Sequence, residues 1–175
     1  MTKAIALFSG GLDSILAVKL MLEQAIEVEA INFVTVFCTC TAHGKTYIDS
    51  KSAADELGIK LKVLEVSKEY FKVIKNPKHG YGSNINPCLD CRIFMLKKAH
   101  QYMKETGAQF LVTGEVLGQR PMSQRKDAMR IIERDSGLEG LILRPLSAKL
   151  MDLTIPEKEG LVDREKLLSI SGRSR

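Results

Sequence analysis

Residues 3–14 of this 175-residue chain read KAIALFSGGLDS, and this stretch decides the fold. Its first half, Lys3–Phe8, is a short apolar run typical of a buried β-strand. The run ends at Ser9-Gly10-Gly11, and the residues from Asp13 to Gln24 then have the apolar content of a helix packed on a sheet. The order strand, glycine turn, helix predicts the first unit of an α/β fold.

The rest of the chain continues this alternation. The further predicted strands are Ile26–Phe37, Ile59–Val66, Gln109–Thr113 and Leu141–Leu143. The further predicted helices are Lys45–Leu57, Asp90–Thr106 and Ser123–Asp135. Strands that alternate with helices form a mostly parallel sheet with helices on both faces. We therefore expect a five-stranded α/β domain over residues 1–147, followed over 148–175 by an irregular arm with a short helix rather than a separate domain.

Composition narrows the class of protein. Hydrophobic residues make up 45% and charged residues 27%, which is ordinary for a globular domain. No apolar run approaches the roughly 18 residues of a membrane helix, and the N-terminal run breaks at glycines without a cleavage pattern. We expect no membrane partner and a cytoplasmic location. The net charge of +5 permits an anionic partner without identifying one.

The glycine turn has the properties of a phosphate-binding loop. It follows the carboxyl end of a strand, where ligands bind in this class of fold. Glycines let backbone amides approach an anion, and the N–H groups at the helix start point at the same place. A carboxylate at Asp13 repels phosphate unless it holds Mg²⁺ or caps the helix. The predicted loop residues are Ser9, Gly10, Gly11, Leu12, Asp13 and Ser14.

The four cysteines form two close pairs. Cys88 and Cys91 are separated by two residues, which lets both sulfurs face one ion. Cys38 and Cys40 follow the second predicted strand, at the same edge of the sheet. In a reducing compartment this pattern indicates metal binding or thiol chemistry. Three interpretations stay open: a zinc or iron–sulfur site, a dithiol that carries sulfur as a persulfide and resolves it as a disulfide, or unligated thiols.

The hexapeptide SGGLDS resembles the signature of the PP-loop ATP pyrophosphatases, the adenine nucleotide alpha-hydrolase-like family. Residues 86–91, NPCLDC, are similar to the cysteine-bearing segment of its tRNA thiolation branch. Residues 113–119, TGEVLGQ, followed by Ser123-Gln124, closely resemble a segment of the PP-loop domain of tRNA 4-thiouridine synthetases. The resemblance covers residues 3–147 and implies a five-stranded parallel sheet that cleaves ATP to AMP and pyrophosphate.

The resemblance also implies the chemistry. ATP and Mg²⁺ activate a tRNA uridine carbonyl as an adenylate, and sulfur from a donor protein or from sulfide replaces its oxygen. The implied catalytic residues are Asp13, Cys88 and Cys91. The further implied ATP and substrate contacts are Thr113, Gly114, Gln119, Arg120, Ser123 and Gln124. An iron–sulfur cluster, with zinc as the alternative, is implied on Cys38, Cys40, Cys88 and Cys91.

The chain departs from that family pattern, because it begins at the first strand without the usual RNA-binding module. We expect the RNA-binding surface to come from another subunit or domain, and dimerisation to be one way of gaining surface. Two alternatives remain open. One is a PP-loop enzyme that inserts sulfur or nitrogen into a small metabolite. The other is a nucleotide- or metal-binding module without catalysis.

Overall fold

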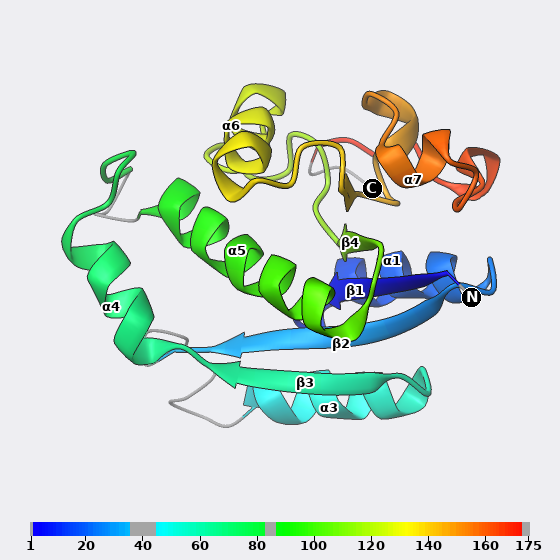
Figure 1. The fold of residues 1–175 in the computed structure, drawn as a ribbon, viewed down its shortest axis with the longest axis horizontal. Helices are drawn as coiled ribbons and strands as arrows, with labels where there is room; N and C mark the ends of the chain where they lie inside the picture. Colours follow the sequence, from blue (N-terminus) through cyan, green and yellow to red (C-terminus); the bar gives the residue numbers. More distant parts are fainter. Residues whose placement is uncertain (1, 36–44, 83–86, 173–175) are drawn as a thin grey trace.

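A computed structural model describes residues 2–35, 45–82 and 87–172, and Figure 1 shows their fold. Its core is one five-stranded sheet in which every pair of neighbouring strands is parallel, in the order β3-β2-β1-β4-β5. The strands are β1 (Lys3–Leu7), β2 (Glu27–Val34), β3 (Lys60–Glu65), β4 (Phe110–Thr113) and β5 (Ile142–Leu143). The predicted five-stranded parallel sheet is confirmed.

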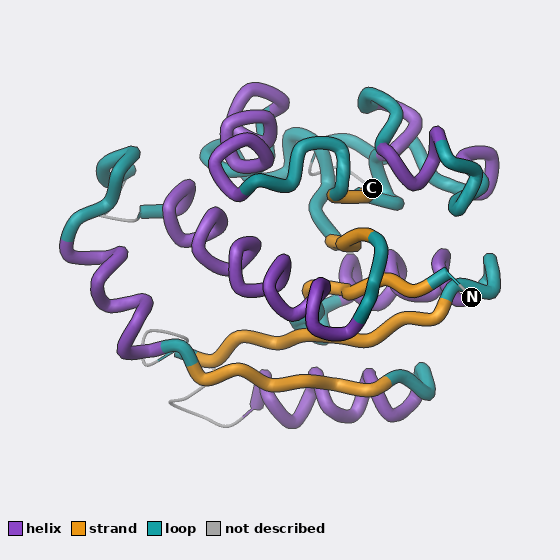
Figure 2. The backbone as a smooth tube through the Cα atoms, in the orientation of Figure 1, coloured by secondary structure: helices purple, strands orange, loops and turns teal. Residues whose placement is uncertain are grey.

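Helices cover both faces of this sheet, as Figure 2 shows. They are α1 (Leu12–Leu22), α3 (Lys45–Glu56), α4 (Ser67–Lys75), α5 (Cys88–Thr106), α6 (Lys126–Ser136) and α7 (Ile155–Lys158), with 3₁₀ turns η2 (Ala148–Leu150) and η3 (Arg164–Lys166). Helix α5 begins two residues before the predicted start, so both of its cysteines lie inside the first turn. Helix α4 was not predicted.

The two faces of β1 are both buried, because its side chains alternate between two hydrophobic clusters. Ala4 and Ala6 belong to the cluster that contains α1 and Ala54 of α3. Ile5 and Leu7 belong to the cluster formed with α5 and α6. Burial on both faces explains why the strand reads as a continuous apolar run rather than as an alternating one.

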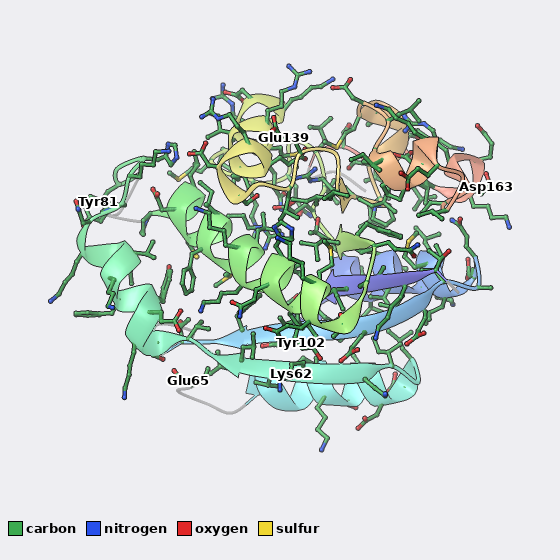
Figure 3. The ribbon with its side chains drawn as sticks, in the orientation of Figure 1. Lys62, Glu65, Tyr81, Tyr102, Glu139 and Asp163 are labelled. Atoms are coloured by element: carbon green, nitrogen blue, oxygen red, sulfur yellow. The ribbon has the colours of Figure 1, made fainter. Side chains whose placement is uncertain are left out.

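The end of α5 is fixed on the sheet. Tyr102 donates a hydrogen bond to Glu29 on β2, and Lys3 Nζ lies 3.1 Å from the same carboxylate. Burial, together with this bond to the carboxylate, raises the pKa of Tyr102 to about 12. Figure 3 shows Tyr102 beside β2. The first turn of α5 lies at the opposite end of the helix, on the side of the molecule towards which the arrows of β2 and β3 point (Figure 1).

The C-terminal segment, residues 148–172, packs back on the domain. Val162 and Leu167 are buried in the α1 cluster, and the chain end pairs with the loop after β4 through Leu117 and Ser171. That this segment does not form a separate domain stays a prediction. Among the described residues, no helix has the length and apolar character needed to cross a bilayer.

Candidate active site

A cavity of about 600 Å³ opens at the carboxyl ends of β1 and β2 and at the loop after β4. Strand β1 lies between β2 and β4, where the strand order reverses, so the cavity occupies the switch point at which such folds bind ligands. The predicted residues that line it are Ser9, Gly11, Leu12, Asp13, Ser14, Gly114, Gln119, Arg120, Ser123 and Gln124. The motifs at 9–14 and 113–124, about 100 residues apart, thus form one site.

The phosphate loop, residues 9–14, is held between two backbone contacts. Gly10 has a φ of +76°, and a Cβ there would lie 2.6 Å from the Cα of Ser50 on α3. A Cβ on Gly114 would lie 2.6 Å from the backbone nitrogen of Ser14. Only glycine leaves room at either position. Gly10 therefore fixes the back of the loop and lies outside the cavity lining.

The polar side chains of the loop are organised around its glycines. Ser14 Oγ donates to the Gly11 carbonyl at 2.8 Å, and Gly11 N donates to Ser9 Oγ at 3.3 Å. Helix α1 begins after Gly11, so Asp13 lies in the first turn and the cap interpretation of its carboxylate is wrong. Asp13 Oδ2 instead accepts from Gln119 Nε2 at 3.1 Å, at the cavity wall.

A buried charge network stands behind the cavity. Glu115 is 5% exposed; its Oε1 accepts from Arg92 Nε at 2.8 Å and its Oε2 from Arg144 Nε at 3.0 Å. Arg144 also pairs with Glu133 on α6. Burial alone would raise the pKa of Glu115, but the charges of Arg92 and Arg144 outweigh it and lower that pKa to about 2. Glu115 is therefore a fixed anion that holds two arginines.

Sequence reasoning missed Arg92 and Glu115, although both line the cavity. The available signals were local: Glu115 lies inside TGEVLGQ, and Arg92 follows Cys91. Their pairing requires the sheet to bring α5 against the loop after β4. Thr113, predicted to contact ATP, is fully buried outside the lining, and its Oγ1 donates to Glu115 Oε2 at 3.2 Å.

The thiol pair lies on α5, the helix that also contributes residues to the cavity wall. Cys88 and Cys91 are half-buried in the first turn of α5, while the residues that α5 contributes to the cavity wall are Arg92 and Met95. Cys38 and Cys40 lie outside the described residues. Within residues 2–35, 45–82 and 87–172, no three His, Cys, Asp or Glu side chains are grouped to hold a metal. Of the thiolates that a metal site would need, the described residues thus supply two.

Asp90, between the two cysteines, ties the start of α5 to the preceding turn. Its buried carboxylate accepts from the backbone N–H groups of Lys78 at 3.1 Å and His79 at 2.9 Å. We call residues 77–80 the strap. At its other side, Asp135 of α6 accepts from Lys78 Nζ at 2.8 Å and lies 2.9 Å from His79 Nε2. Hydrogen bonds from Lys78, then Arg134 and His79, hold the pKa of Asp135 well below its usual range.

Comparisons with known proteins identify a family for most of this chain. A family model described as ThiI, thiamine biosynthesis protein, matches residues 1–152. A protein named probable tRNA sulfurtransferase, from Thermococcus kodakarensis, is 32% identical over 164 residues, which is 94% of this chain and 40% of that protein. The chain thus spans about two-fifths of the length of the first curated relatives it matches.

Solved structures share the fold. A 4-thiouridine synthetase, crystallised as an RNA complex with bound ATP, superposes with a TM-score of 0.66 at 26% identity, over 82% of this chain and 36% of that chain. The U34-tRNA thiolase NcsA from Methanococcus maripaludis, described with its [4Fe-4S] cluster, gives a TM-score of 0.50 at 20% identity, over 98% of this chain and 52% of that one.

Proposed function

The chain belongs to the ThiI family, and from that membership we propose that it transfers sulfur to a uridine carbonyl of tRNA at the expense of ATP. This membership confirms the resemblance that SGGLDS and TGEVLGQ indicated. The observation that carries the proposal is that the phosphate loop and the thiol-bearing helix α5 line one cavity, with Arg92, next to Cys91, in its wall. The sulfurtransferase relative and the ATP- and RNA-bound synthetase support the same substrates.

The first step would activate the carbonyl. Backbone amides of the phosphate loop and the start of α1 bind the β- and γ-phosphates. The uridine oxygen attacks the α-phosphorus, an O–P bond forms, and pyrophosphate leaves with the electron pair of the bond that breaks. Asp13 fits Mg²⁺, because this ion binds through one or two carboxylates together with phosphate oxygens and water. A poor leaving group, the carbonyl oxygen, thereby becomes part of AMP.

The second step would deliver sulfur from the thiol pair. The terminal sulfur of a persulfide on Cys91 or Cys88 attacks the activated carbon, the C–O bond breaks, and AMP leaves with its electron pair. The other thiolate then attacks the cysteine-bound sulfur, so that the terminal sulfur stays on the RNA and a Cys88–Cys91 disulfide forms. Sulfide can attack this disulfide and regenerate persulfide and thiolate, so the cycle needs no outside oxidant or reductant. A donor protein that carries a persulfide would instead require a thiol reductant.

The same thiols suit a metal centre. Cys88 and Cys91 would supply two thiolate ligands for an iron–sulfur cluster or for zinc, and Cys38 or Cys40 would have to supply the others. We write the sulfur-transfer step on the thiols of Cys88 and Cys91 because these are the cysteines that the structure describes. Iron, zinc and acid-labile sulfide analysis of the anaerobically purified protein separates these cases.

The test is an anaerobic assay with ATP, Mg²⁺ and sulfide, run with and without bulk tRNA. We expect AMP and pyrophosphate to form faster with tRNA, and thiolated uridine to appear by nucleoside mass spectrometry. Cys91→Ser should bind ATP normally and lose thiolation. Lys98→Gln is the control, since Lys98 lies on the same helix and pairs with Glu69 of α4, outside the cavity lining.

Two results would contradict the proposal. If tRNA leaves the rate of AMP formation unchanged, a small metabolite replaces RNA as the substrate. If Cys91→Ser thiolates tRNA as fast as the unmodified chain, sulfur does not pass through this thiol pair as written. A protein that binds ATP tightly and never cleaves it would be a nucleotide-binding module.

A further inference from the structure

A second cavity, of about 220 Å³, lies between α6, the end of β5 and the segment that runs from η2 to α7. Among the described residues, none lines both this cavity and the larger one at the phosphate loop. A cavity of about 150 Å³ with an apolar lining is large enough for a benzene ring, so this one has room for one ring and a polar group. Its apolar lining residues are Met129, Ile142, Leu143, Ala148, Met151 and Leu153.

Arg144 brings a buried cation to the wall of the second cavity. Its side chain is 2% exposed; its Nε donates to Glu115 at 3.0 Å and its Nη1 donates to Glu133. Its Nη2 is buried, and no described residue accepts a hydrogen bond from it. A buried donor without an acceptor costs free energy. Because two carboxylates fix the guanidinium, Nη2 is also held in one direction, ready for an oxygen of a bound molecule.

The charged side chains of this wall and their partners carry one net positive charge. Within the described residues they form three sets, of which two are neutral. The third set, at the exposed mouth, holds two cations against one carboxylate. A ligand with one negative charge would therefore leave the whole group neutral. The sets are Arg92–Glu115–Arg144–Glu133, Glu157–Arg164 and Lys126–Asp152–Arg130.

We propose that the second cavity binds a small organic acid that has one carboxylate and an apolar body the size of a single ring. Arg144 Nη2 donates to the carboxylate, and the apolar side chains of the wall contact the ring. A largely apolar cavity with a few fixed polar groups is the usual form of a small-molecule site. The site lies outside the proposed sulfur-transfer reaction, so its test needs neither ATP cleavage nor tRNA.

The first experiment compares three probes on the unmodified chain by titration calorimetry. Benzoate should bind saturably at one site. Benzamide keeps the ring and one acceptor oxygen but lacks the charge, so it should bind about ten-fold more weakly. Inorganic phosphate lacks the apolar body and should bind this cavity more weakly than benzoate. No saturable benzoate binding up to about 10 mM, or equal affinity for benzoate and benzamide, would overturn the proposal.

The second experiment places the bound benzoate. An anion could also bind at the phosphate loop, because helix starts attract anions. The titration is therefore repeated with pyrophosphate at a saturating concentration, which occupies that loop. Benzoate bound in the second cavity should keep its affinity under these conditions. If pyrophosphate displaces benzoate, the acid binds at the phosphate loop and the second cavity is not its site.

The third experiment uses a matched pair of variants at the mouth of the second cavity. Leu153 lines the cavity and is 49% exposed, whereas Leu150, on η2, is 41% exposed and lies outside the lining. Leu153→Asp places a carboxylate beside the bound acid and should weaken benzoate binding by about ten-fold. Leu150→Asp adds the same charge nearby and should bind benzoate like the unmodified chain. Equal affinities in the two variants would overturn the proposal.

Arg144 itself gives the most direct variant. Arg144→Lys keeps the charge but has one nitrogen for all of these acceptors, so benzoate binding should fall by about ten-fold or more. Unchanged benzoate affinity in a folded Arg144→Lys protein would overturn the role of Nη2. If this buried substitution prevents folding, the Leu153 and Leu150 variants still decide the proposal, since both positions are about half exposed. A chain that binds benzoate here and never thiolates tRNA would refute the proposed function alone.

Discussion

The phosphate loop and the thiol corner, which is the first turn of α5 with Cys88 and Cys91, are held in different ways. The loop is fixed by steric backbone contacts, Gly10 against Ser50 and Gly114 against Ser14. The thiol corner is fixed by hydrogen bonds from the strap to Asp90. The phosphate loop, which is the nucleotide half of the proposed site, therefore leaves no room for a side chain at Gly10 or Gly114. The thiol corner, which is the sulfur half, is positioned by polar contacts. We expect substitutions to separate the two halves.

The largest effect should come from Gly114→Ala. A Cβ at 2.6 Å from Ser14 N must displace the backbone of the phosphate loop, and a misplacement of about 1 Å at a reacting centre costs roughly 100-fold in rate. We expect AMP formation to fall by at least that factor and ATP binding to weaken. The control is Gly58→Ala, which is strained at φ +66° but meets nothing within 4 Å. Equal losses in both variants would mean that general destabilisation, not the loop, is responsible.

The next effect concerns the stability of the fold at acid pH, to which Glu115 in the cavity wall contributes. The folded pKa of Glu115 is about 2 against an ordinary 4.5, so its charge stabilises the fold above pH 4.5 and that contribution is lost as pH falls towards 2. The shift corresponds to roughly 3 kcal/mol. In urea unfolding, the gap between the unmodified chain and Glu115→Gln should narrow by that amount as pH falls. A gap independent of pH would contradict this coupling to Arg92 and Arg144.

A smaller and more selective effect is expected from Asp90→Asn. The amide keeps one acceptor for the two strap N–H groups that the carboxylate now binds. Thiolation should fall by about ten-fold, the cost of one hydrogen bond to a charged group, while AMP binding stays normal. Glu69→Gln is the control, because its ion pair joins α4 to α5 without touching the strap. If AMP binding fell equally, the two halves would not be separable.

The smallest effect should follow Asp135→Asn. Its partner Lys78 is 74% exposed, so salt already screens much of this ion pair. We expect thiolation to fall by about two-fold at low ionic strength and by less at high salt. The measurement is the rate of thiolated uridine formation over a salt series. If the thiolation rate fell as much as in Asp90→Asn, the side-chain contacts of the strap would matter as much for thiolation as its backbone contacts.

Much of the fold could be predicted because it depends on local patterns. The apolar runs predicted the five strands, and the glycine turn predicted the phosphate loop at the switch point. Helix α4 was missed because it is nine residues long and buries little: Phe71 is 45% exposed and Tyr70 alone is buried. Its apolar residues at 70, 71, 73 and 74 do follow helical spacing, but the segment is shorter than the roughly 10–12 residues at which length favours a helix over a strand.

The candidate site was predictable only in part. The loop and TGEVLGQ lie next to each other because parallel strands end at one edge. The Arg92–Glu115–Arg144 network joins residues 23 and 29 positions apart, and no local pattern reports such a pairing. The predicted convergence of Cys38 and Cys40 on the thiol pair stays a prediction, because those residues lie outside the described ranges.

The pairing of Leu117 with Ser171 has a practical consequence for handling the protein. Gly172 N donates to Leu117 O at 2.8 Å. The end of the described chain therefore contacts a residue that precedes Gln119 by two positions and Arg120 by three, and both of these line the cavity. An affinity tag or fluorophore attached there would emerge beside the cavity wall. Lys3 begins β1 at the amino edge, about 17 Å of strand away from the loop. Immobilisation and labelling for the binding experiments therefore belong at the N-terminus.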